Sequence, residues 1–188
     1  MPLVCVYASS SQKLEASLYE SVENIGHGAA CAGWELIFGG ARIGLMDSVA
    51  KGFQRGGGRV TAVIPKVFDR RELAYAAAEE TIVTSDLRER KKIMQERADA
   101  FLVLPGGPGT LDEFFETLTL VQIRVMNKPI LLWNRREHFR GTLDQIRLMS
   151  ERGYAHGPLE DHFDVRVTAE EVVAQLAHYA PATPKNPG

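Results

Sequence analysis

Residues 100–110 read AFLVLPGGPGT, a short apolar run that ends in a turn built from proline and glycine. An apolar run without alternation is typical of a parallel strand that helices cover on both faces of its sheet. From Leu111 onward the apolar residues recur at helical spacing, which predicts a helix directly after the turn. A buried strand, a glycine turn and a helix in succession predict one βα unit of an α/β fold.

The same succession recurs along the chain. Apolar, β-branched runs predict seven strands, at Leu3 to Tyr7, Glu35 to Phe38, Arg59 to Ile64, Thr81 to Thr84, Ala100 to Leu104, Pro129 to Trp133 and Phe163 to Val167. Helical patterns between them predict a doubly wound α/β fold with a mainly parallel sheet and helices on both faces. We expect one domain over residues 1–180 and a disordered tail over residues 181–188, which is rich in proline.

Composition and charge limit the classes of partner. The chain has 188 residues, 45% of them hydrophobic, which suffices for a full core without disulfides or a metal. The net charge is −2 with both signs interspersed, so we expect neither a nucleic-acid partner nor a membrane partner. Residues 1–10 have no basic segment ahead of their apolar residues, and we therefore expect a cytoplasmic protein.

The cysteines and histidines suggest no metal or redox chemistry. We interpret Cys5 and Cys31 as small buried apolar residues of a protein in a reducing compartment. The five histidines are scattered without the spacing of metal ligands, so we expect surface or loop positions for them and no metal site. Trp34 and Trp133 flank predicted strands and are expected in the core.

Two glycine-rich turns follow predicted strands, and in an open α/β sheet ligands bind at that edge. Residues 39–44 read GGARIG and residues 105–110 read PGGPGT. Each leads into a helix, where backbone N–H groups and the helix dipole favour a phosphate. Neither turn matches the P-loop or the dinucleotide pattern, so a monophosphate is favoured over triphosphates and NAD. For the first turn alone, a simple strand-to-helix connection explains the glycines equally well.

The segment from Asp86 to Ala98 predicts a helix with two cations on an unusual face. Asp86 is the expected N-cap, with Glu89 three residues later as in a capping box. The expected apolar stripe is Leu87, Met94 and Ala98. Arg90 and Lys91 flank this stripe near the positive end of the helix, where cations oppose the dipole. A ligand-binding role explains that placement, and a solvated charged face is the alternative.

The helix after the second glycine turn carries a carboxylate near the expected phosphate site. Thr110 and Glu113 fit a capping box, which alone would account for Glu113. The buried stripe is expected at Leu111, Phe114, Phe115, Leu118, Val121 and Val125. Glu113 and Glu116 then lie one turn apart on a neighbouring face. A carboxylate there repels a phosphate but stabilises a ribosyl cation or activates water, which favours catalysis over storage.

These residues resemble a known family. Residues 105–113 match the PGGxGTxxE signature of the LOG (Lonely Guy) family of cytokinin riboside 5′-monophosphate phosphoribohydrolases, and residues 90–94 match its RKxxM element. The resemblance implies a Rossmann-like fold and hydrolysis of an adenosine-type 5′-monophosphate, AMP or an N6-modified AMP, to the free base and ribose 5-phosphate. It also implies no cofactor, no metal and at least a homodimer.

The family motifs assign the expected site residues. Arg90 and Glu113 fall on its catalytic positions. The expected substrate-binding residues are Gly39, Gly40, Lys91, Met94, Pro105, Gly106, Gly107, Gly109, Thr110 and Glu116. Members of this family often carry the label lysine decarboxylase, but nothing in the sequence marks a lysine that forms a Schiff base with pyridoxal phosphate. The alternative function, of a different class, is a non-catalytic carrier of a nucleotide or pterin phosphate, like the molybdenum cofactor carriers.

Overall fold

The computed structural model describes residues 1–68 and 75–180, and the predicted tail at 181–188 lies outside the described residues. Seven strands form one parallel sheet in the order β4-β3-β2-β1-β5-β6-β7. The strands are β1 (Leu3–Tyr7), β2 (Glu35–Phe38), β3 (Val60–Pro65), β4 (Glu80–Thr84), β5 (Ala100–Val103), β6 (Ile130–Trp133) and β7 (Asp164–Arg166). Each predicted strand is present with ends within one residue of those expected, and the doubly wound parallel fold is confirmed.

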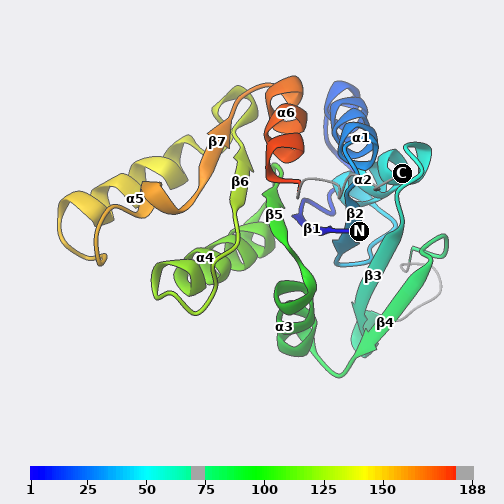
Figure 1. Cartoon of the computed structure of the whole chain (residues 1–188), viewed down its shortest axis with the longest axis horizontal. Helices are drawn as coiled ribbons and strands as arrows, with labels where there is room; N and C mark the ends of the chain where they lie inside the picture. The colour runs from blue at the N-terminus through cyan, green and yellow to red at the C-terminus, as the bar shows by residue number, and fades with distance from the viewer. Residues whose placement is uncertain (69–74, 181–188) are drawn as a thin grey trace, which may run out of the picture.

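Helices cover both faces of the sheet, as Figure 1 shows. The α-helices of the described residues are α1 (Ala16–Cys31), α2 (Gly44–Arg55), α3 (Leu87–Arg97), α4 (Pro108–Gln122), α5 (Arg140–Glu151) and α6 (Ala169–Tyr179). Short 3₁₀ turns are η1 (Lys66–Phe68), η2 (Arg135–Glu137) and η3 (Leu159–His162). Residues of α1, α2 and α6 pack on one face and residues of α3, α4 and α5 on the other. Among the described residues, no helix has the length and apolar character needed to span a bilayer.

The central strands are buried on both sides because each face has its own hydrophobic core. Along β1, alternate residues divide between the two cores, with Val4 and Val6 in one and Cys5 and Tyr7 in the other. Trp34 and Trp133 are both 1% exposed, as expected. This rigid double layer fixes where the loops at the carboxyl ends of the strands lie.

Three predictions of burial are wrong. Cys31 is exposed, because it is the last residue of α1 and lies away from the core-facing stripe. Leu87 is 45% exposed because it begins α3 at the rim of the sheet rather than over it. Val125 is 70% exposed because α4 ends at Gln122, so the helical spacing that predicted its burial no longer applies.

Candidate active site

A cavity of about 630 Å³ lies at the carboxyl ends of the central strands. The chain winds from β1 outward to β4 and then returns to place β5 on the other side of β1. The loops after β1 and β5 therefore diverge to opposite faces of the sheet and leave a crevice between them. Residues from the loops after β1, β2 and β5 and from α3 and α4 line the cavity.

The first glycine turn, after β2, is explained mainly by packing. Gly40 and Gly44 have φ of +73° and +66°, a conformation that favours glycine. A Cβ at Gly44 would lie 2.6 Å from Ser9 O, where the turn meets the loop after β1. Gly39 lines the cavity, and Gly39 and Gly40 both line a smaller adjoining cavity of about 250 Å³. The alternative interpretation of a strand-to-helix connection therefore holds for part of this turn.

The second glycine turn, after β5, faces the main cavity. Gly107 is the N-cap of α4 and Pro108 is its first residue, so the prediction that Thr110 caps the helix is wrong. Proline fits this position because it fixes φ and needs no hydrogen-bond acceptor, and the helix accordingly begins two residues before Thr110. The N–H groups of Gly109 and Thr110 then belong to the first turn, which has no intrahelical acceptors. They are donors for an anion at the positive end of α4.

Arg90 and Glu113 meet at the edge of this cavity. Arg90 Nη2 lies 2.7 Å from Glu113 Oε1, and the two side chains are 17% and 11% exposed. Arg90 comes from the first turns of α3, which Asp86 caps by accepting bonds from the N–H groups of Arg88 and Glu89. Arg90 Nε is buried and has no hydrogen-bond partner among the described residues. Arg90 also lines the cavity, so its guanidinium can reach a ligand there.

Burial dominates the protonation of Glu113. Loss of hydration raises its pKa to about 7, against the opposing effect of the Arg90 guanidinium, while Asp112 adds repulsion. A carboxyl group with a pKa near neutrality exchanges its proton under physiological conditions. This property suits a group that stabilises positive charge or activates water.

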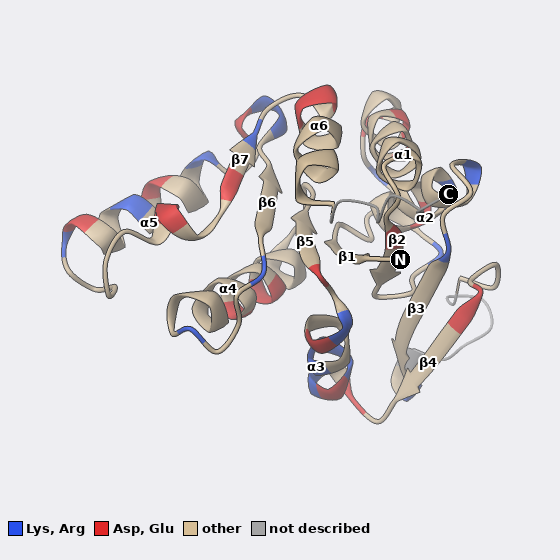
Figure 2. Ribbon diagram, in the orientation of Figure 1, with Lys and Arg blue, Asp and Glu red and all other residues tan. Residues whose placement is uncertain are grey.

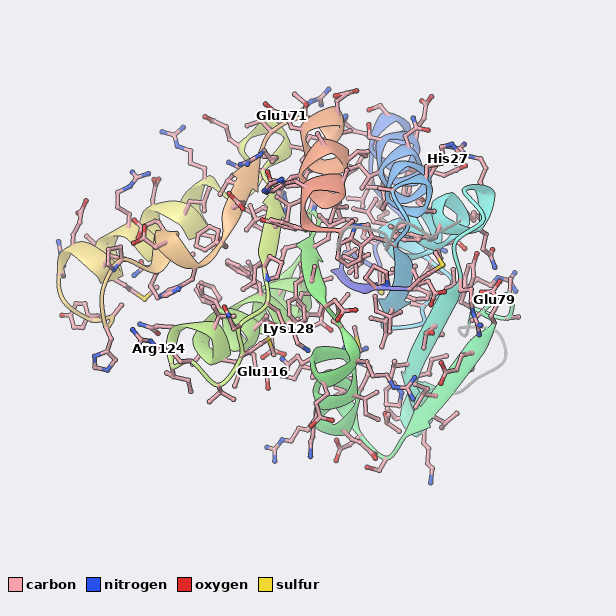
Figure 3. All side chains as sticks on the ribbon, viewed as in Figure 1. His27, Glu79, Glu116, Arg124, Lys128 and Glu171 are labelled. Carbon is pink, nitrogen blue, oxygen red and sulfur yellow. The ribbon has the colours of Figure 1, made fainter. Side chains whose placement is uncertain are left out.

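Lys91 joins α3 to α4 on the neighbouring face. Its Nζ lies 2.9 Å from Asp112 Oδ2 and 2.6 Å from Glu116 Oε2. Although burial alone would lower the pKa of Lys91, its hydrogen bonds to Glu116 and Asp112 raise it. Figure 2 shows both basic and acidic residues on α3 and acidic residues on α4, and Figure 3 places Glu116 on the side of α4 toward α3. Lys91 lines the cavity, whereas Glu116 does not.

A buried chain of two hydrogen bonds links the backbone of Glu113 to Tyr7 at the end of β1. Thr117 Oγ1 donates to the carbonyl of Glu113 at 2.9 Å, so it must accept from the hydroxyl of Tyr7 at 3.0 Å. Tyr7 and Thr117 are 2% and 0% exposed. Burial also raises the pKa of Tyr7 well above its usual value, so its hydroxyl keeps its proton. The chain ties the turn of α4 that carries Glu113 to the end of β1.

Substitutions of the two side chains in this hydrogen-bond chain are expected to have unequal effects on stability. Thr117→Val removes the hydroxyl that accepts from buried Tyr7, and we expect the free energy of unfolding to fall by about 1–3 kcal/mol. Tyr7→Phe removes the donor and leaves Thr117 bonded to Glu113, with an expected loss of about 0.5–1.5 kcal/mol. Urea denaturation of both variants measures the difference. A larger loss in Tyr7→Phe would contradict the assigned direction of the chain.

The structure brings most of the predicted site residues together. The cavity is lined by Gly39, Arg90, Lys91, Gly107, Gly109, Thr110 and Glu113. Met94 is 1% exposed in the core beneath α3, and the carbonyl of Pro105 accepts a bond from the N–H of Ser9 at 3.2 Å. The N–H of Gly106 points to the ring of His138, at 3.2 Å, rather than into the cavity.

Sequence reasoning missed several residues at the cavity. Ser9, Ser10 and Ser11 were not among the expected binding residues, because this turn departs from the family pattern, yet they line the cavity directly after β1. Met46 lines both adjoining cavities from the first turn of α2. His138 reaches the glycine turn from the loop after β6, a contact that no sequence pattern indicates. The described residues contain no cluster of three or more His, Cys, Asp or Glu suited to a metal ion.

Comparisons with known proteins agree on one family. The family described as "Possible lysine decarboxylase" matches residues 46–176. The chain is 40% identical over 151 residues to a cytokinin riboside 5′-monophosphate phosphoribohydrolase of Mycobacterium tuberculosis, which covers 80% of each chain. It is 33% identical over 178 residues to the enzyme of the same name, LOG3, of Arabidopsis thaliana, which covers 95% of this chain and 83% of the relative.

Solved structures share the fold at lower identity. The molybdenum cofactor carrier protein of Chlamydomonas reinhardtii superposes with a TM-score of 0.71 at 19% identity, over 95% of this chain and 97% of the carrier. At that identity the likeness is one of fold, and the Rossmann-like architecture is common to both. The functional comparison therefore depends on the sequence relatives and on the cavity.

Proposed function

This chain belongs to the LOG family of cytokinin riboside 5′-monophosphate phosphoribohydrolases, and from that membership we propose that it hydrolyses the N-glycosidic bond of an adenosine-type 5′-monophosphate. The products are the free base and ribose 5-phosphate. The observation that carries the proposal is the Arg90–Glu113 pair, which borders the same cavity as Gly107, Gly109 and Thr110 of the second glycine turn.

The proposed reaction uses the two halves of the site differently. The N–H groups of Gly107, Gly109 and Thr110 hold the 5′-phosphate at the N-terminus of α4. As the bond from the anomeric carbon to the base breaks, the base leaves with the electron pair and the ribose gains positive charge. The Glu113 carboxylate stabilises that charge and orients the attacking water. The water supplies hydroxyl to the anomeric carbon and, in net terms, a proton to the base.

Arg90 has two proposed roles. Its Nη2 keeps part of Glu113 ionised near neutral pH, because the guanidinium opposes the effect of burial on the pKa. Its guanidinium also lines the cavity and contacts the bound substrate there. The proposed binding set further includes Gly39 and Lys91, which line the cavity.

A lysine decarboxylase activity is not supported by the lysine at this site. A lysine that forms a Schiff base needs a neutral amine, which enzymes obtain by lowering its pKa. Lys91 is held between Asp112 and Glu116, and these hydrogen bonds raise its pKa. Its amine is therefore held as the cation, the state opposite to the one that chemistry needs.

The proposal includes a homodimer in the cytoplasm. The family resemblance supports the homodimer, and so do the exposed apolar side chains of Ile123 and Val125, 53% and 70% exposed beyond the end of α4. The free thiols of Cys5 and Cys31 support a reducing compartment.

Incubation of purified protein with AMP, and separately with isopentenyladenosine 5′-monophosphate, tests the function. We expect chromatography to show the free base and ribose 5-phosphate in equal amounts, and the ratio of the two rates to identify the preferred substrate. A bound nucleotide that is recovered intact, without turnover of either substrate, would instead identify a carrier.

A further inference from the structure

His138 contacts the glycine turn from outside the cavity. Its Nε2 lies 2.9 Å from Gly106 O and 3.2 Å from Gly106 N, and the N–H of Gly106 points at the ring. In the described residues it is the one side chain that hydrogen-bonds the backbone of Gly106. We propose that His138 is a positioning residue: it holds Gly106 so that the amides of the following residues face the phosphate. The inference rests on the proposed function of this turn.

Gly106 is confined on its other sides. A Cβ at Gly106 would lie 2.0 Å from Thr110 Oγ1, and Thr110 is 4% exposed. The preceding carbonyl, of Pro105, accepts the N–H of Ser9 at 3.2 Å. The peptide is thus held between α4, the loop after β1 and the His138 ring. Of these three contacts, only the one with His138 is made by a side chain from the loop after another strand, β6.

The loop that carries His138 has an unusual backbone. Arg136 and Glu137, which precede it, have φ of +48° and +58°, a region that non-glycine residues avoid. Such a conformation persists when its surroundings fix it, and here Arg136 Nη1 lies 2.8 Å from both carboxylate oxygens of Glu15. A loop held in this way presents His138 in one orientation.

The residue after His138 anchors it to the core. Phe139 is 1% exposed, and its ring meets the imidazole edge-on, with centroids 4.7 Å apart. The N–H of Phe139 donates to Asn134 Oδ1 at 2.8 Å, which closes the loop on itself. The ring of His138 therefore packs on the buried Phe139 ring, and this contact holds its Nε2 beside Gly106.

The chemistry of the contact between His138 and Gly106 indicates which substitution of His138 preserves it and which removes it. A neutral imidazole nitrogen either accepts the N–H of Gly106 or donates to its carbonyl, depending on the tautomer. A glutamine amide at this position has a donor and an acceptor at similar reach, whereas leucine fills space and has neither. His138→Gln is thus the conservative variant, and His138→Leu removes the contact while keeping bulk.

The test separates binding from chemistry. We expect His138→Leu to raise KM for AMP and the Kd for inorganic phosphate, both by about tenfold, with kcat within about threefold of the wild type, because the turn binds phosphate equally in ground and transition states. His138→Gln is expected to restore both constants to within about threefold of the wild type. His156→Ala, on an exposed loop, serves as the matched control. Calorimetry with inorganic phosphate measures binding at the glycine turn in the absence of any reaction.

Several outcomes would overturn the positioning role. One is an unchanged phosphate Kd in a folded His138→Leu protein, and another is a glutamine variant as impaired as the leucine variant. A wild-type protein that binds no phosphate also ends the inference. If phosphate binding responds as expected but no nucleotide is hydrolysed, the positioning role stands and the proposed enzymatic function fails. Should the leucine variant not fold, the glutamine variant and the Gly106 amide proton resonance still test the contact.

Discussion

Glu113→Gln is expected to reduce kcat for AMP hydrolysis by about 10³-fold while AMP still binds. Glutamine keeps the size of the side chain but lacks the charge that offsets a ribosyl cation. The glycine turn is untouched, so calorimetry should give an AMP affinity close to that of the wild type. Full activity in this variant would end the assignment of Glu113.

The same residue sets an expected pH dependence. Because burial raises the pKa of Glu113 to about 7, kcat/KM of the wild type should rise with pH as the carboxylate forms and level off above about pH 8. Stability should change in the opposite direction. The folded pKa lies above the ordinary glutamate value of 4.5, so the contribution of this group is fully present below pH 4.5 and is lost as pH rises through about 7. Glu113→Gln should abolish that part of the pH dependence of unfolding.

Arg90→Ala is expected to lower kcat/KM at pH 7 by about 10²-fold or more, through lost contact to the substrate and through Glu113. Without the guanidinium 2.7 Å away, a buried carboxyl group keeps its proton to higher pH. The rise of the pH–rate profile should therefore move to higher pH, with part of the activity recovered there. The titration of the substrate phosphate stays in place and serves as an internal reference.

Two further variants sharpen this experiment. Arg90→Lys keeps a cation near Glu113 and should shift the profile less than alanine does. Arg97→Ala removes a cation at the far end of α3 that pairs with Glu80 at 2.8 Å, and it should leave the profile unchanged. An unshifted profile in Arg90→Ala would mean that the ion pair does not control the protonation of Glu113, and an unchanged rate would return Arg90 to the interpretation of a solvated charged face.

The sequence was sufficient to predict the sheet because its strands are determined by local composition. The run from Ala100 to Leu104 is apolar throughout, and such runs have few alternatives to a buried parallel strand. The family motifs assigned Arg90 and Glu113 to one site, but they did not predict the direct contact between the two side chains, which lie 23 positions apart in the sequence. Periodicity placed Arg90 near the core-facing side of α3, and its side chain is indeed only 17% exposed.

The failures have different physical causes. Thr110 looked like an N-cap because threonine is a good cap, but Pro108 starts the helix earlier and takes precedence. Val125 was predicted to be buried because it continues the helical spacing of apolar residues, but α4 ends at Gln122. His138 lies 32 residues from Gly106, and its contact depends on how two loops approach each other in space. Local patterns hold no information on such approaches.

The turn after β5 contains glycines of two kinds. A Cβ at Gly106 would overlap Thr110, whereas one at Gly107 or Gly109 would meet no protein atom within 4 Å. Selection for folding accounts for the first glycine but not for the other two. Cellular quality control removes proteins by their stability. Natural alanine variants at 107 or 109 should therefore accumulate to normal levels as inert protein, while an alanine at 106 should be cleared.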